Sequence, residues 1–190
     1  MTPATKGHPE LLEVLRTYQV AFKAKVYGEE NDDHDALMDV FSINPATKRE
    51  NRQYWGRELG MCWQRLVTTA CSAAVRDRYS PGLRIGGDEL CDLCLDTDAI
   101  DTKYRIGSGD SGTLKKFKTY GDSLMKRGLR PVMLILRDDN LPAAVTACKT
   151  GGWTVFSGDA SFEYLQGKVG VDLKKWLLHH RSRFGVVREG

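Results

Sequence analysis

The sequence predicts an α/β fold, in which a mixed central sheet is flanked by helices and preceded by a helical N-terminal part. Two observations support this class. Apolar residues recur at helical spacing up to about residue 76, and after Leu83 short strand-like runs alternate with helical segments. The run 131–136 is apolar at every position, which is typical of a strand buried on both faces, so helices are expected to cover both sides of the sheet.

The composition is that of one ordinary globular domain. Of the 190 residues, 41% are hydrophobic and 28% charged, and the net charge of +3 permits a polyanionic partner without requiring one. We divide the chain into a helical N-terminal part (1–49), a core (50–160) and a C-terminal helical region (161–190). The apolar runs are too short to span a bilayer and no charged-then-apolar leader opens the chain. We therefore expect a cytoplasmic protein without membrane contact, whose five cysteines are reduced.

The first third of the chain reads as helices. Helical spacing of apolar residues predicts a first helix over Leu11–Phe22, in a run that Gly28 ends. A second, short helix follows the capping cluster 31–33 and is broken at 44–45. A long amphipathic helix is predicted over about 50–76. Its expected apolar face carries Trp55, Leu59, Cys62, Leu66 and Ala70.

The rest of the chain predicts a hairpin followed by alternating helices and strands. The hairpin consists of strands at 91–95 and 99–106, around an acidic turn at Asp96 and Thr97. After it we expect a glycine-rich loop at 107–112, a helix at 113–126, a strand at 131–136, a helix at 143–149, a strand at 153–156 and a helical region at 162–180.

The hairpin carries the most informative side chains. Side chains alternate along a strand, so Asp101 and Lys103 share one face. A two-residue or four-residue loop sets Asp92 opposite Asp101, with Cβ atoms roughly 4.5–5.5 Å apart. Carboxylates held so closely repel each other, and a Mg²⁺ ion would relieve the repulsion, with Lys103 placed to orient the attacking water. An odd-length loop would move Asp92 out of register and leave an ordinary exposed hairpin.

A first Asp, a spacer and then Asp-x-Lys on a hairpin, followed by a helix and a buried strand, resembles the PD-(D/E)xK nuclease superfamily. The resemblance covers about residues 50–156 and implies a restriction endonuclease-like core. It also implies that Asp92 and Asp101 bind the metal and that Lys103 is the catalytic lysine. Cys91 stands where the family has proline, and the second acid is Asp where Glu is commoner. Asp88 is the alternative first acid.

The resemblance suggests further site residues. Many members add a glutamate from the helix before the hairpin, and Glu58 matches that position, although a glutamate on the solvated edge of a helix is equally consistent with the pattern. Cations and hydroxyls flanking the site are candidates for contacts with DNA, or else ordinary polar surface. These candidates are Arg49, Arg52, Arg105, Ser108, Ser111, Lys115 and Lys116.

The resemblance and the chain's small size favour a type II restriction endonuclease. Such an enzyme uses Mg²⁺ to hydrolyse phosphodiester bonds in double-stranded DNA at a short specific sequence, and members that cut palindromes act as homodimers. The alternatives are a structure-selective repair or junction-resolving nuclease of the same superfamily, and a non-catalytic DNA-binding module. Cys91-x-x-Cys94 is predicted to pack in the core, because on a continuous strand these two side chains face opposite ways.

Overall fold

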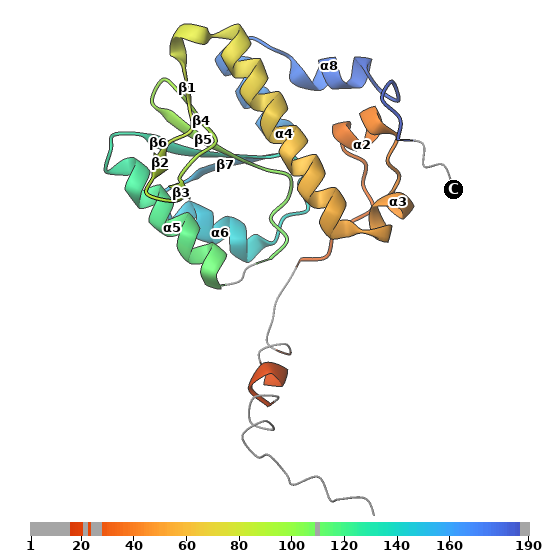
Figure 1. Cartoon of the computed structure of the whole chain (residues 1–190), viewed down its shortest axis with the longest axis horizontal. Coiled ribbons are helices and arrows are strands. Elements are labelled where there is room, and N and C mark those ends of the chain that lie inside the picture. Colours follow the sequence, from red (N-terminus) through yellow and green to blue (C-terminus); the bar gives the residue numbers. More distant parts are fainter. Residues whose placement is uncertain (1–15, 21–22, 24–27, 109–110, 187–190) are drawn as a thin grey trace, which may run out of the picture.

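The computed structural model describes residues 16–20, 23, 28–108 and 111–186, and for Ser111 the backbone alone. Residues 16–20 are helical, in agreement with the first predicted helix. The remainder of the predicted Leu11–Phe22 helix, residues 11–15 and 21–22, lies outside the described residues. The described chain is an α/β structure with helices on both sides of a mixed sheet (Figure 1), as the sequence predicts.

The sheet has five strands in the order β1-β4-β5-β6-β7. Strands β1 (Tyr79–Pro81), β4 (Leu93–Leu95) and β5 (Asp98–Lys103) form an antiparallel half. Strands β6 (Arg130–Ile135) and β7 (Thr154–Ser157) continue the sheet in parallel with β5. Helices connect the parallel strands because such strands need long crossovers, whereas the antiparallel β4–β5 pair needs only a tight turn.

Three short strands were not predicted. Pro81 ends the first of them, the edge strand β1, where the missing N–H of proline removes no hydrogen bond from the sheet. A second, two-stranded sheet then joins β2 (Arg84–Ile85) to β3 (Asp88–Glu89). Gly86 turns this hairpin with φ of 61°, a conformation that glycine adopts readily.

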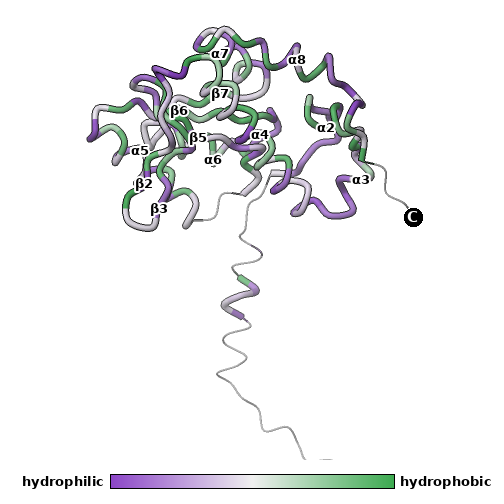
Figure 2. The backbone as a smooth tube through the Cα atoms, turned by 45° about the horizontal axis from the view of Figure 1, so that its top comes forward, coloured by the Kyte–Doolittle hydropathy of each residue, from purple (hydrophilic) through white to green (hydrophobic). Residues whose placement is uncertain are grey.

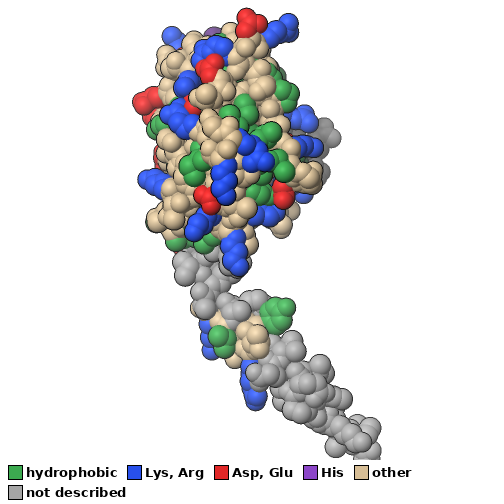
Figure 3. Space-filling view, turned by 90° about the vertical axis from the view of Figure 1, so that its left-hand side faces the viewer, with side chains coloured by type: hydrophobic (Ala, Val, Ile, Leu, Met, Phe, Trp, Pro, Cys, Tyr) green, Lys and Arg blue, Asp and Glu red, His purple; other side chains and the backbone are tan. Residues whose placement is uncertain are grey.

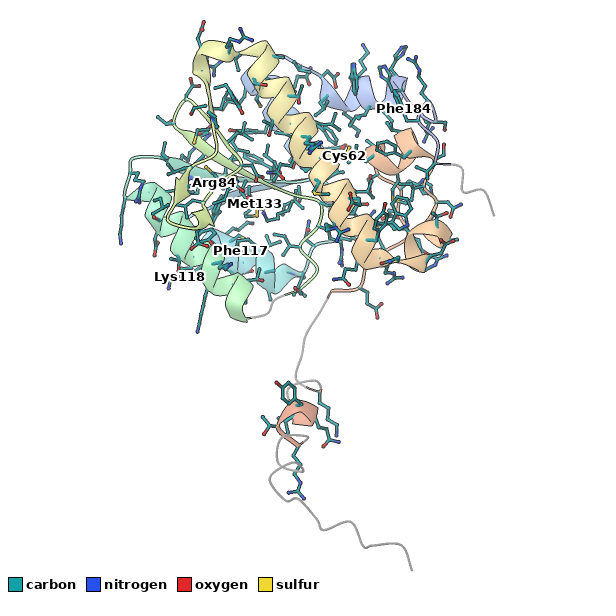
Figure 4. All side chains as sticks on the ribbon, in the orientation of Figure 1. Cys62, Arg84, Phe117, Lys118, Met133 and Phe184 are labelled. Carbon is teal, nitrogen blue, oxygen red and sulfur yellow. The ribbon has the colours of Figure 1, made fainter. Side chains whose placement is uncertain are left out.

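Two layers of helices sandwich the sheet (Figures 1 and 4). Helices α4 (Arg52–Ala74) and α7 (Asp159–Val169) cover one face, and α5 (Ser111–Met125) and α6 (Pro142–Thr150) cover the other. Met133 on the sheet and Phe117 on α5 pack in the second layer. Figure 2 shows hydrophobic stretches along the inner strands and hydrophilic ones toward the periphery. The core is therefore divided by the sheet into two hydrophobic clusters.

The remaining helices lie around the first layer. Helix α2 (Ala36–Phe41) packs against α8 (Leu173–His179), and α3 (Pro45–Glu50) leads into α4. A short 3-10 helix, η1 (Arg76–Arg78), follows α4. The single C-terminal helical region expected from the sequence is thus two helices, α7 and α8.

The starts of α2 and α3 differ in detail from the prediction, although the helical run is interrupted before Pro45 as expected. The cap of α2 is Asp35, whose Oδ1 accepts the N–H groups of residues 37 and 38, and not the cluster 31–33. The Asn44-Pro45 step begins α3, because the Asn44 side chain caps the N–H of Thr47 and proline suits the first turn.

The buried face of α4 is rotated slightly from the expected one. Trp55 and Leu59 are buried as predicted, but Cys62, Leu66 and Ala70 are only half-buried. The side chains at the centre of the buried face are Trp55, Leu59, Trp63, Val67 and Cys71. The indole N–H of Trp63 donates to a carbonyl oxygen of β6 at 3.2 Å, which fixes the rotation of the helix on the sheet.

Candidate active site

The hairpin pairs in the register that the sequence predicts. A two-residue turn, Asp96-Thr97, connects β4 to β5 and sets Leu93 opposite Ile100. Asp96 adopts φ of 54°, which Asp tolerates better than most residues. The backbone N–H of Asp92 donates to the carbonyl of Ile100 at 2.9 Å. The register therefore brings Asp92 alongside Asp101.

Beyond the end of the β4–β5 ladder, the Asp92 carboxylate acts as the hydrogen-bond acceptor that a backbone carbonyl of β4 would otherwise provide to β5. Pairing between β4 and β5 ends at Leu93, which would leave the next N–H of β5 unpaired. Asp92 Oδ2 accepts this N–H, from Thr102, and the Thr102 hydroxyl, both at 2.6 Å. Asp92 Oδ1 accepts from Gln64 Nε2 of α4 at 2.7 Å. Three donors therefore fix the orientation of this carboxylate.

Asp101 and Lys103 form an ion pair beside Asp92. Lys103 Nζ lies 2.7 Å from Asp101 Oδ2, and the two side chains are 37% and 15% exposed. Burial raises the pKa of Asp101 to about 6, with the neighbouring Asp92 adding to the rise and Lys103 opposing it. Burial by itself would lower the pKa of Lys103, but the Asp101 and Asp92 carboxylates outweigh it and raise that pKa. The site thus holds an ammonium group beside two carboxylates, and the Asp92 carboxylate disfavours the ionised form of Asp101.

The alternative acid, Asp88, lies on a different hairpin, formed by β2 and β3. It is exposed on β3, and its Oδ1 accepts from the Tyr120 hydroxyl of α5 at 2.8 Å. The hydrogen bond to Asp88 raises the pKa of Tyr120, and Asp101 adds a smaller effect, so Tyr120 lies near both acids. The structure therefore pairs Asp101 with Asp92 and separates Asp88 by a tyrosine.

A cleft of about 870 Å³ opens between α4 and the end of β5. On its helical wall Gly56 and Gly60 lie one turn apart, and a Cβ added at Gly56 would meet nothing within 4 Å. Glycine in a helix interior costs about 1 kcal/mol of stability relative to alanine, and the packing around Gly56 does not require it. The wall is completed by Arg52, Gln53, Arg57, Met61 and Gln64, and the opposite side by residues 28–30 and 102–105.

Glu58 is not among the residues that line this cleft. Its Oε1 pairs with the neighbouring Arg57 at 2.9 Å, and it lines a separate depression with Cys62 and Arg65. The residue of α4 that contacts Asp92 is Gln64, which was not predicted because an amide side chain carries no charge that would mark it as a metal-site residue. The structure therefore does not bring Glu58 to the predicted metal-binding residues.

Arg105, expected at the DNA surface, is instead part of the internal support of the cleft. It donates to the carbonyls of Gly28, Glu29 and Asp139 at 2.7–2.9 Å, and its side chain is 11% exposed. This arrangement fastens residues 28–29 to the loop after β6. The guanidinium therefore donates its hydrogen bonds to backbone carbonyls of the protein and not to a ligand.

The other predicted DNA contacts are spread over two surfaces. Arg52 is exposed at the cleft, whereas Arg49 pairs with Asp32 at 2.5 Å. Lys115 and Lys116 are exposed on α5, on the side where Figure 3 shows many Lys and Arg side chains. Ser108 is half-exposed in the loop before α5, and the side chain of Ser111 lies outside the described part of the chain.

The two cysteines of Cys91-x-x-Cys94 do not face opposite ways as predicted. Their Sγ atoms lie 3.7 Å apart, because β4 begins at Leu93 and the chain bends at Asp92. Both side chains are buried in the cluster on the α5–α6 side of the sheet. The expected core packing is therefore confirmed, although the geometric reason given for it was wrong.

Comparison with known proteins gives no relative. No family model matches the sequence, and no curated protein or solved structure matches it. Within the described residues, no group of three or more His, Cys, Asp and Glu side chains is arranged to hold a metal ion. In the same part of the chain, none of the helices is both long and apolar enough to cross a membrane.

Proposed function

We propose that the protein is a Mg²⁺-dependent nuclease that hydrolyses phosphodiester bonds in double-stranded DNA, with a PD-(D/E)xK active site. The observation that carries the proposal is the grouping of Asp92, Asp101 and Lys103 on the β4–β5 hairpin, next to a cleft that Lys103 and Gln64 line and the two acids do not. Two carboxylates with a lysine suit a metal-assisted reaction on a charged phosphate, in which charge must be stabilised on a non-bridging oxygen.

The acid pair fits a hard divalent cation. Mg²⁺ is usually held by one or two carboxylates and keeps waters or phosphate oxygens in its remaining positions. A carboxylate has about four acceptor positions, and the three donors on Asp92 leave one for a cation. The pKa of Asp101, raised to about 6, reflects burial and charge repulsion that a cation would offset. A third acid from the described chain is not needed for such a site.

Each side chain has a part in the reaction. A bound Mg²⁺ would polarise the phosphate and lower the pKa of a bound water. Asp92 and Asp101 would hold the cation, and the Lys103 ammonium would orient the water and stabilise the charge that develops on the phosphate. Gly56 and Gly60 leave space for a sugar-phosphate strand along α4, and Arg52 offers a phosphate contact at the same cleft.

The order of elements also supports the proposal. In the core, α4 precedes an antiparallel β1–β4–β5 set, and α5 then leads to β6, parallel to β5. The resemblance to the superfamily implies a hairpin with the acids followed by a helix and a buried strand, which this order matches. Among its members we propose a type II restriction endonuclease, acting as a cytoplasmic homodimer on a palindromic site.

Cleavage of DNA of known sequence tests the function. With Mg²⁺ we expect discrete fragments, and Asp101→Asn or Lys103→Met should abolish them while binding, measured with Ca²⁺, persists. Two matched controls should cut normally. They are Asp96→Asn, on the turn of the same hairpin, and Lys149→Met, at an exposed position of α6. Near-normal cutting by Asp101→Asn or Lys103→Met would contradict the active-site assignment.

The same experiment separates the alternatives. Cleavage of branched DNA without discrete fragments from linear DNA would indicate a junction-resolving or repair nuclease. Binding to DNA with no cleavage under any divalent cation would indicate a non-catalytic binding module.

A further inference from the structure

We propose that Gln64 is a positioning residue, whose side-chain amide holds the Asp92 carboxylate in the orientation that binds a divalent cation. This inference rests on the proposed function and deepens it, because it assigns a role in the proposed site to an uncharged residue of α4. Gln64 Nε2 lies 2.7 Å from Asp92 Oδ1, and 28 positions separate the two residues in the chain.

The contact fixes Asp92 from the side that the hairpin cannot reach. Thr102 of β5 holds Oδ2 with two donors, while Oδ1 has Gln64 as its donor. Without Gln64 no side chain of α4 would hold Oδ1, and the carboxylate would be held by Thr102 at Oδ2 alone. A ligand carboxylate held by outer hydrogen bonds keeps its geometry before the cation arrives, which favours binding.

The orientation of the amide follows from the chemistry of its partner. An ionised carboxylate only accepts hydrogen bonds, so Gln64 must turn its NH₂ toward Asp92 and its Oε1 elsewhere. Gln64 lines the cleft, and no hydrogen bond to Oε1 is formed within the described part of the chain. The amide therefore has an acceptor left for water at the site, and it adds no third negative charge to Asp92 and Asp101.

A glutamate at position 64 would reverse this balance. Its carboxylate would meet Asp92 Oδ1 at hydrogen-bond distance with no proton to donate, next to the Asp101 carboxylate. Gln64→Glu should therefore destabilise the protein without divalent ions, and divalent ions should raise its Tm more than they raise that of the wild type. If Gln64 merely packed against Asp92, the Gln64→Glu substitution would lower the Tm by the same amount with and without the cation.

Binding of Mn²⁺ without DNA, measured by calorimetry or electron paramagnetic resonance, tests the inference. Gln64→Met keeps the length of the side chain and removes its donor, and we expect the dissociation constant to rise about 10–100-fold, as for other outer hydrogen-bond partners of metal ligands. Gln53→Met is the matched control, because Gln53 lines the same cleft on the same helix, and its affinity should equal that of the wild type.

The outcomes distinguish this inference from the proposed function. If the wild type binds Mn²⁺ and Gln64→Met binds it within about twofold as tightly, the role of Gln64 is wrong while the nuclease proposal stands. If the wild type binds Mn²⁺ but never cuts DNA, the nuclease proposal is wrong and the affinities alone decide the role of Gln64. If the wild type binds no Mn²⁺, both are wrong. Gln64→Glu gives a second test through its Tm should Gln64→Met fold poorly.

Discussion

Replacing Asp98 with asparagine removes a buried charge at the first residue of β5. The Asp98 carboxylate is 2% exposed and accepts two hydrogen bonds from Arg130, at 2.6 Å each. Lys168 Nζ and the Tyr164 hydroxyl each lie 2.7 Å from its Oδ2. These contacts tie the starts of β5 and β6 to α7, so the substitution tests how the strand that carries Asp101 and Lys103 is held in the fold.

The expected loss of stability follows from the burial of each partner. Removing one member of a buried ion pair costs about 3–5 kcal/mol. The side chains of Arg130 and Lys168 are 50% and 31% exposed, so water can replace part of what they lose. The hydroxyl of Tyr164 is buried and has no such compensation. We therefore expect Asp98→Asn to lower the free energy of unfolding by about 2–4 kcal/mol, or Tm by about 4–16 °C.

The effect should depend on pH in a definite direction. Burial by itself would raise the pKa of Asp98, but Arg130, Lys168 and Tyr164 outweigh it and hold that pKa well below its usual range. A depressed pKa in the folded state stabilises the protein above the unfolded pKa of about 3.9, and the stabilisation is lost as pH falls through the folded value. The difference between wild type and Asp98→Asn should thus be constant from about pH 5 to 8 and shrink below about pH 4.

Urea unfolding followed by circular dichroism at several pH values measures this difference. The control is Asp96→Asn, which removes an acid from the same hairpin whose partner is the exposed Arg78. Water solvates that pair well, so the control should be far less destabilised. Equal stability of the two variants at pH 7 would show that the contacts of Asp98 do not stabilise the fold.

Three further predictions concern the site. Mn²⁺ affinity should fall about tenfold from pH 7 to pH 5, because the cation must displace a proton from Asp101, whose pKa is about 6; calorimetry that shows no change over this range would contradict the value. Gly56→Leu should raise the free energy of unfolding by about 1 kcal/mol yet reduce DNA cleavage, because the new side chain projects from the wall of the cleft. The control is Gly167→Leu on α7, where a side chain also meets no neighbour, and it should stabilise the protein without reducing cleavage. Equal cleavage by the two variants would show that DNA does not use the cleft. Lys103→Arg should fail to restore the cleavage lost in Lys103→Met, since a planar guanidinium does not replace a compact ammonium; full activity of Lys103→Arg would reduce the role of the lysine to its charge.

The sequence was sufficient to predict local features of the site. The register of Asp92 against Asp101 depends on the parity of one short loop and on the alternation of side chains, and both are visible in the residues 92–103. The parallel strand β6 could be predicted because it is apolar at every position after Arg130. By contrast, β1 to β3 have only two or three residues each and are interrupted by proline and glycine, so they give no periodic signal.

Contacts between distant segments could not be predicted. Whether Glu58 or Gln64 reaches the acids depends on how α4 is rotated against the sheet, which is set by the contact of Trp63 with β6. Arg105 donates hydrogen bonds to carbonyls that lie 34 and 77 positions away in the chain, and the residues next to Arg105 in the sequence do not indicate these contacts. Helical periodicity defines a buried face but not the neighbour that each polar edge meets.

The acid pair also has a consequence for how the chain reaches its fold. Asp92 and Asp101 belong to one hairpin closed by a two-residue turn, and such hairpins form in about 1–10 μs. Gln64 and β6 come from distant segments, and pairing β6 with β5 requires the crossover through α5, which is a slower event. The nascent hairpin therefore carries two opposed carboxylates before Gln64 of α4 and strand β6 are in place. Refolding followed by stopped flow should accelerate when Mg²⁺ is added, and Asp101→Asn should remove this acceleration. If the proposed Mg²⁺ site forms on the hairpin, the cation takes part in folding as well as in the proposed reaction.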